Sequence, residues 1–203
     1  ATLRQLGVLY THRAEELKAL DYFHEAIKEG EKAGDQKFLA SIYNNLGILY
    51  MNTGQFEKAI PEYRKLLESG IKENIVLYQA FAYNNIGQSY LNLDMPDSSI
   101  YYNEKSVALG VKNNFGQIIS VGYTNLGVAY DKLKEFARAK EYFVLAMKKG
   151  NEIGDITSVA NATQGMAEVH LFMKEYRISV KYCEEGLVLA ERISSMQFKK
   201  EIY

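Results

Sequence analysis

One eight-residue stretch decides the fold, because it returns along the chain at a constant spacing. It reads YNNLGILY at residues 43–50, and it recurs as YNNIGQSY at 83–90 and YTNLGVAY at 123–130. Two less similar copies flank these three, LRQLGVLY at 3–10 and TQGMAEVH at 163–170. The same 40-residue step separates every pair of neighbouring copies. A fixed period of this length predicts stacked supersecondary units rather than one globular core.

Each 40-residue unit is predicted to contain two helices. In the second unit, residues 35–52 form the first helix and residues 55–72 the second, because apolar residues recur there at three- and four-residue steps. Gly54 is expected to end the first helix, since glycine readily adopts the left-handed conformation. The turns between units are expected near Gly34, Asn74, Asn114 and Gly154.

Small residues also recur at this period, which predicts close approach of neighbouring helices. One site of the first helix holds Gly7, Gly47, Gly87, Gly127 and Ala167, and one site of the second holds Ala19, Ala59, Ser99, Ala139 and Ser179. A late site of the second helix holds Gly30, Gly70, Gly110 and Gly150. Large residues, with Tyr10, Tyr50, Tyr90 and Tyr130 foremost, are expected to fill the remaining space.

Composition narrows the class of protein. The 203 residues are 47% hydrophobic and 24% charged, values typical of a folded soluble protein. The net charge of -1 argues against a dedicated nucleic-acid binder, which normally carries a basic stripe. No apolar run approaches the ~20 residues that span a bilayer. We therefore expect neither nucleic acid nor membrane as a direct partner of this segment.

Catalysis finds little support in the sequence. His12, His24 and His170 lie in separate repeats without metal-ligand partners at helical spacing, and His170 occupies the tyrosine site, where packing is the expected role. Cys183 excludes an internal disulfide, and its place at an aromatic site predicts a buried, inert thiol. No phosphate-binding or nucleophile motif occurs. The sequence predicts no enzyme activity, no cofactor and no metal.

At the level of the repeat, the chain resembles the tetratricopeptide repeat family. That family carries L-G-x-x-Y in the first helix and A-x-x-x-[FY] in the second, matched here by Leu46, Gly47, Tyr50, Ala59 and Tyr63. The resemblance implies an all-α fold, a right-handed α-solenoid of stacked antiparallel helix hairpins. The predicted units are 1–35, 36–75, 76–115, 116–155 and 156–195, with 196–203 starting a further helix in one array.

The unit is longer than the family's usual repeat of about 34 residues. It resembles the variant of kinesin light chains and of bacterial signalling proteins. The resemblance implies a non-catalytic scaffold that binds a peptide or protein segment on a concave face. The alternative is a sensory segment of a larger bacterial signalling protein, with a histidine kinase or DNA-binding domain beyond residue 203 as an intramolecular partner. A cytoplasmic location is expected, and a periplasmic one stays open because a signal segment could have been removed.

Asparagines on the first helices are the candidate binding residues. At about 100° per residue, Asn44 and Asn45 lie on the side of the helix opposite Tyr43 and Tyr50. A carboxamide both donates and accepts, so a row of them can pair with the main chain of a ligand. The predicted peptide-binding residues are Asn44, Asn45, Asn52, Phe81, Asn84, Asn85, Gln88, Asn92, Asn125 and Val128.

A structural interpretation of the same asparagines stays open, in which they bond to adjacent backbone and hold the stack together. Phe81 is likewise open to packing between units, and we favour packing over a ligand pocket. Chaperone-binding members of the family clamp a C-terminal carboxylate with lysine and arginine. The matching sites here hold asparagine and threonine, and Lys132 is the nearest basic residue, so we expect no such clamp.

Overall fold

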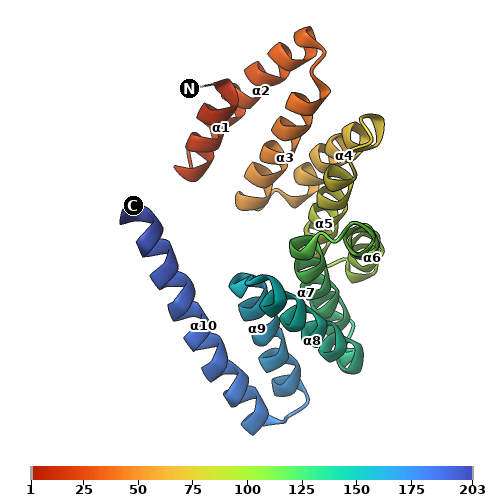
Figure 1. Cartoon of the computed structure of the whole chain (residues 1–203), viewed down its shortest axis with the longest axis vertical. Coiled ribbons are helices and arrows are strands. Elements are labelled where there is room, and N and C mark those ends of the chain that lie inside the picture. Colours follow the sequence, from red (N-terminus) through yellow and green to blue (C-terminus); the bar gives the residue numbers. More distant parts are fainter. Residues whose placement is uncertain (1, 203) are drawn as a thin grey trace. The chain divides into compact units, whose positions relative to one another are not determined.

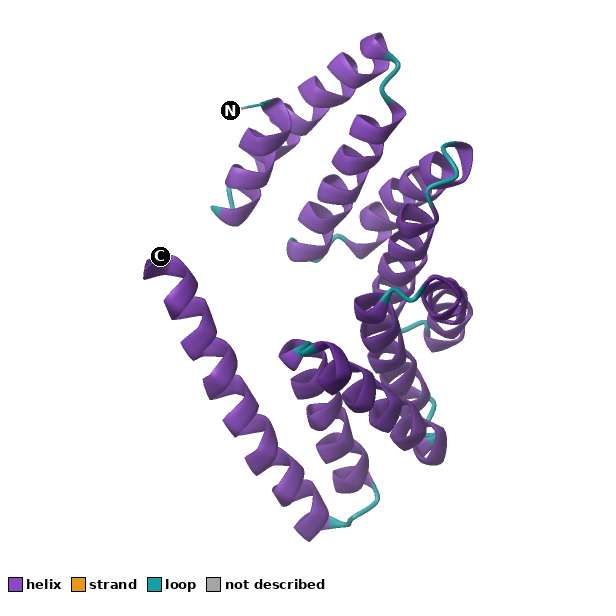
Figure 2. Cartoon of the chain, in the orientation of Figure 1, coloured by secondary structure: helices purple, strands orange, loops and turns teal. Residues whose placement is uncertain are grey.

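A computed structural model describes the backbone of residues 2–202 and the side chains of residues 2–195. The described residues form ten α-helices and no strand, in agreement with the all-α prediction (Figures 1 and 2). The helices are α1 (Leu3–His12), α2 (Glu16–Ala33), α3 (Gln36–Asn52), α4 (Phe56–Lys72), α5 (Val76–Asn92), α6 (Pro96–Asn113), α7 (Gly116–Lys132), α8 (Phe136–Ile153), α9 (Ile156–Phe172) and α10 (Tyr176–Ile202).

The chain divides into two compact units, residues 1–95 with α1–α5 and residues 96–203 with α6–α10. In each unit every helix packs on the next helix along the chain. Alternate helices also meet, α1 and α5 with α3 in the first unit and α7 with α9 in the second. Each unit is therefore a stack of helical hairpins, the solenoid packing that the 40-residue period predicts.

The turn inside each hairpin has the same geometry in all five repeats. One residue of each turn adopts a positive φ, and these residues share one register of the repeat: Ala14, Gly54, Asp94, Lys134 and Lys174. In the second repeat the Gln55 backbone N–H then donates to the Tyr50 carbonyl over 2.8 Å. This bond satisfies a carbonyl left open at the helix end. The prediction that Gly54 ends α3 in the left-handed conformation is confirmed.

Lys134→Gly should stabilise the protein by about 0.5–1 kcal/mol. Lys134 has a φ of 61°, which disfavours a side chain with a Cβ, whereas Gly54 holds the equivalent place at 72° without that penalty. The measurement is the free energy of unfolding in urea. The matched control is Gly54→Lys, expected to destabilise by a similar amount. Equal stability of parent and both variants would contradict this account of the turn.

The turns between hairpins form a second series. Gly34, Asn74, Asn114 and Gly154 all have positive φ, as the sequence predicts. After two of them an aspartate caps the next helix: Asp35 Oδ1 accepts from the Phe38 N–H over 3.0 Å, and Asp155 Oδ1 accepts from the Ser158 N–H over 3.1 Å. Local sequence therefore sets both the stop and the restart of the helix.

The predicted start of a further helix at Met196 is wrong. Helix α10 continues without interruption from Tyr176 to Ile202. The residue equivalent to the glycine or asparagine of the other four turns is Ser194. Serine has no special tolerance for positive φ, so nothing at this place favours leaving the helix.

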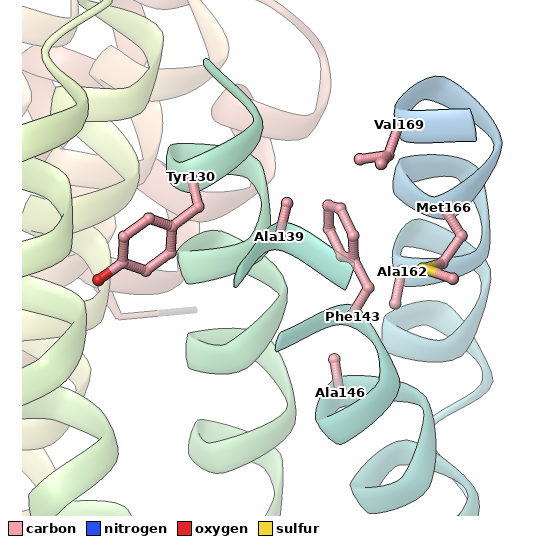
Figure 3. Packing of buried hydrophobic residues seen from close by; sticks show 7 residues of the cluster. All are labelled: Tyr130, Ala139, Phe143, Ala146, Ala162, Met166 and Val169. Carbon is pink, nitrogen blue, oxygen red and sulfur yellow. The ribbon is translucent and has the colours of Figure 1, made fainter. Parts of the chain in front are cut away.

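Glycines on the first helices lie under aromatic rings of the second helices. A Cβ added to Gly127 on α7 would lie 2.5 Å from Cε1 of Phe143 on α8, and one added to Gly165 on α9 would also collide with the Phe143 ring. Figure 3 shows Phe143 on α8 with Ala162 and Met166 on the facing α9. Phe143 is 1% exposed, so its ring fills the space that both glycines leave.

The late glycines of the second helices allow the next hairpin to approach, as predicted. A Cβ on Gly30 would lie 2.8 Å from Leu39 Cδ2, and one on Gly150 would lie 2.7 Å from Val159 Cγ2. Gly70 and Gly110 have comparable contacts with α5 and α7. The small residues that recur at one site of the second helix are buried as well: Ala19, Ala59, Ser99, Ala139 and Ser179.

Residues at the tyrosine site pack on the following second helix. Tyr130 stacks on Tyr142 with ring centroids 5.4 Å apart, and Tyr10 stacks on Tyr22 at 5.3 Å. His170 holds this site in the last repeat and stacks on Tyr182 at 5.5 Å. The prediction that His170 is a packing residue is confirmed.

Candidate functional site

A pocket opens between the first helices of the first unit. Its volume is about 210 Å³. Helix α1 contributes one residue, α3 four, α4 one and α5 two. The lining residues are Arg4, Ala40, Ser41, Asn44, Asn45, Leu66, Tyr78 and Phe81. The pocket thus brings together three of the predicted binding residues, Asn44, Asn45 and Phe81.

The asparagines of this pocket retain hydrogen-bond donors that the fold does not use. The Asn45 side-chain nitrogen is buried and has no hydrogen-bond partner among the described residues. Asn44 Oδ1 accepts from Asn85 Nδ2 over 3.2 Å, so the oxygen of Asn44 is engaged by the next repeat. A buried donor without a partner costs about 1–3 kcal/mol. A ligand oxygen at Asn45 would offset that cost.

Phe81 is 38% exposed and borders the pocket. Asn84 follows Phe81 by three residues on α5 and is 8% exposed. Its side-chain nitrogen has no hydrogen-bond partner in the described part of the chain. Asn84 does not line the pocket.

The remaining predicted residues of the first unit lie toward the ends of their helices. Asn52 is exposed at the end of α3. Asn92 Nδ2 donates to the Gln88 carbonyl on its own helix over 3.1 Å. The side chains of Asn52, Gln88 and Asn92 do not line the pocket that contains Asn45.

In the second unit the predicted residues have partners inside the fold. Asn125 is 4% exposed, and its Nδ2 donates to Asn103 Oδ1 over 3.2 Å. Asn103 in turn donates to the Ser99 carbonyl over 2.9 Å. Val128 packs against the core cluster around Phe143. Asn125 and Val128 therefore contribute to packing of the second unit.

The asparagines of this row differ in their contacts. The Asn85–Asn44 and Asn125–Asn103 bonds connect neighbouring helices, as in the structural interpretation. Asn45 has no such bond and lines a pocket. A binding role is consequently best supported for Asn44 and Asn45, where donors stay open.

Sequence reasoning missed Arg4 as a member of the site. Arg4 is the equivalent of Asn44 in the first, less similar copy of the repeat, and it lines the same pocket. The 40-residue period could have predicted this, because it gives Arg4 and Asn44 equivalent positions on neighbouring first helices. The prediction considered only Lys132 as a basic residue near the asparagines.

Asp131, on α7, is a carboxylate whose acidity the fold changes. Burial raises its pKa above the ordinary value of 3.8, Glu168 raises it further and Lys132 opposes the shift. Its Oδ1 is buried and has no hydrogen-bond partner among the residues described. The charged form is thus disfavoured in the folded protein.

Asp131→Asn should stabilise the protein at pH 7, by less than about 1 kcal/mol because Asp131 is only partly buried and solvent screens part of its charge. A raised folded pKa means that the parent gains stability as pH falls toward 3.8. The difference in unfolding free energy between the variant and the parent should therefore be smaller at pH 4 than at pH 7. The measurement is urea unfolding at both pH values, and a gap that widens at pH 4 would contradict this sign.

Within the described residues, no three His, Cys, Asp or Glu side chains lie close enough to hold a metal. His12 and His24 are exposed on separate helices. No described helix is long and apolar enough to cross a membrane.

The prediction that Cys183 is buried is wrong. Its thiol is free and exposed on α10. The equivalent residues Phe23, Tyr63 and Phe143 are buried, and the first helix of the following hairpin packs against Phe23 and Phe143. Among the described residues no such helix follows α10, so the side chain at this site stays open to solvent.

Models of one protein family match the chain over both units. Two tetratricopeptide repeat models match residues 38–110 and 122–148. The helix pairs continue through the rest of the described chain, and a glycine lies under an aromatic ring in the first, second and fourth repeats. Residues 38–110 and 122–148 therefore belong to tetratricopeptide repeats. A comparison with curated protein sequences gives no match.

Several solved structures share the fold at low sequence identity. The apo form of RapI is 16% identical with a TM-score of 0.83, and the match covers 98% of this chain and 73% of RapI. Aspartyl phosphate phosphatase F from Bacillus subtilis is 16% identical with a TM-score of 0.83, covering 93% and 49%. The Rap conjugation gene regulator of plasmid pLS20, solved with the Phr* peptide, is 14% identical with a TM-score of 0.76, covering 98% and 55%.

Proposed function

We propose that this protein is a non-catalytic scaffold that binds an extended peptide or protein segment. The binding site is the pocket between α1, α3 and α5 of the first unit. The observation that carries the proposal is the Asn45 amide nitrogen, a buried donor without a partner on a residue that lines this pocket. A peptide main chain offers carbonyl oxygens to such donors at regular intervals.

The pocket also suits one side chain of such a segment. Its volume of about 210 Å³ is small, and Leu66, Ala40 and the half-exposed Phe81 supply apolar surface beside the amides. Main-chain pairing with amides tolerates many ligand sequences, whereas a bordered pocket selects among side chains. The structural likeness to a regulator solved with a peptide supports a peptide ligand.

A selection experiment tests the proposal. The immobilised chain is used to select from a library of random soluble dodecapeptides, and selected peptides are measured by calorimetry against Asn44→Ala/Asn45→Ala/Phe81→Ala. We expect at least about 10-fold weaker binding, since each lost hydrogen bond is worth about 0.5–1.5 kcal/mol. The fold should survive, because Asn45 contributes no described hydrogen bond through its nitrogen.

The matched control is Asn113→Ala/Asn151→Ala/Tyr101→Ala, which removes the same kinds of group from exposed positions outside the pocket. Binding by the control should equal that of the parent. Equal binding by the pocket variant, or no selected peptide at all, would contradict the proposal.

A second candidate function is a sensory segment that controls another domain of a longer protein. It is favoured by the same likeness to a regulator in complex with a peptide, of which this chain covers 55%. In that case the selected peptide would act as an effector. The discriminating measurement is the activity of the full-length protein with and without the peptide.

A further inference from the structure

The pocket of the first unit contains more hydrogen-bond donors than acceptors. Arg4 presents a guanidinium group with five N–H donors and no acceptor. Asn45 adds an amide nitrogen without a partner. The Asn44 oxygen is already engaged by Asn85, and the Ser41 hydroxyl donates to the Phe38 carbonyl over 2.7 Å. A ligand that fits this inventory must bring acceptor oxygens.

The charge of the pocket also favours a ligand with acceptor oxygens. The eight lining residues include one cation, Arg4, and no acidic residue. Within the part of the chain that the structure describes, no carboxylate pairs with Arg4, whereas Lys18, Lys65 and Lys149 each have an acidic partner. Arg4 is also partly buried, so its charge is screened less than that of an exposed arginine. The pocket therefore carries an uncompensated positive charge.

We propose that the pocket binds an aspartate or glutamate side chain of the peptide, with Arg4 pairing to the carboxylate and Asn45 donating to one of its oxygens. This inference rests on the proposed function, and it adds the chemistry of the ligand. Guanidinium and carboxylate groups match in plane and can share two parallel hydrogen bonds. The residue next to the acid in the ligand is apolar and packs on Phe81, which is 38% exposed.

A single cation favours a carboxylate over a phosphorylated residue. A phosphate group carries nearly two negative charges and three strong acceptors, and recognition sites for it use clusters of arginine. The pocket supplies one arginine and neutral amides. This set matches the single charge and two oxygens of a side-chain carboxylate.

The test uses a positional-scanning library of acetylated and amidated heptapeptides, each pool having one fixed central residue. Blocked ends remove terminal carboxylates, so any acid preference reports a side chain. The parent should bind pools fixed as Asp or Glu about 10- to 100-fold more tightly than pools fixed as Asn or Gln, the range for a charge-assisted hydrogen bond. Arg4→Gln should remove this preference, and Arg4→Glu should favour Lys and Arg pools.

Arg13→Glu is the matched control, because it makes the same change of charge on an exposed residue outside the pocket. It should keep the preference of the parent. Binding of library peptides without preference for acids would overturn this inference and leave the proposed function standing. An acid preference that survives in Arg4→Gln would overturn the role of Arg4. No binding to any pool, or to peptides from the random library, would contradict the proposed function itself.

Discussion

Replacing Phe143 with alanine should lower the free energy of unfolding by about 3–5 kcal/mol, the usual range for a buried phenylalanine. The ring is 1% exposed and fills the space between Gly127 and Gly165. Neither glycine has a side chain that could move into the cavity, so relaxation would be small. We therefore expect the upper part of this range.

Urea unfolding followed by circular dichroism measures the effect. Tyr176→Ala serves as control, because Tyr176 is an aromatic residue of the neighbouring hairpin with 59% exposure. Its loss should change stability by no more than about 0.5 kcal/mol. A loss below about 1.5 kcal/mol for Phe143→Ala, well under the usual range, would show that α7, α8 and α9 close the cavity by moving together.

The opposite change, Gly127→Leu, should also destabilise the protein, by about 1–3 kcal/mol or more. The added Cβ would lie 2.5 Å from Phe143 Cε1, so the ring or helix α8 must shift. Leucine is a better helix former than glycine by roughly 1 kcal/mol, which reduces the net loss without cancelling it. The expected sign therefore depends on the contact with Phe143.

A double variant tests that dependence. In Gly127→Leu/Phe143→Ala the leucine can occupy the space of the missing ring, so the loss should be smaller than the sum of the two single losses. Gly186→Ala is the control for helix propensity, since its nearest neighbour would be Thr163 Cγ2 at 3.9 Å. We expect Gly186→Ala to stabilise by about 0.5–1 kcal/mol. Strict additivity of the double variant would contradict overpacking as the cause.

Much of the fold could be predicted because it depends on local chemistry repeated at fixed spacing. Gly54 ends a helix and Asp35 caps the next one through bonds between residues that are close neighbours in sequence. Such signals are readable in the sequence wherever they recur. The error at Met196 followed from extending the period to Ser194, which lacks the residue type that makes the turn.

The site could be predicted only in part, because its residues are equivalent in sequence and differ in their contacts. Asn45, Asn85 and Asn125 share one register, yet Asn85 bonds to the preceding first helix and Asn125 to the preceding second helix. Whether an amide is used by the fold depends on which side chain faces it. That neighbour lies in another repeat and varies independently of the motif.

Apart from the continuation of α10 past Ser194, sequence alone determined the helices, their turns and the places of the small residues, since each follows from backbone preferences and from the 40-residue period. Only the tertiary structure decided which polar groups stay without a partner, that Arg4 joins Asn44 and Asn45 in one pocket, and that Cys183 is exposed. The physical reason is that hydrogen bonding and burial are properties of pairs of residues. They are settled when one hairpin packs on the next.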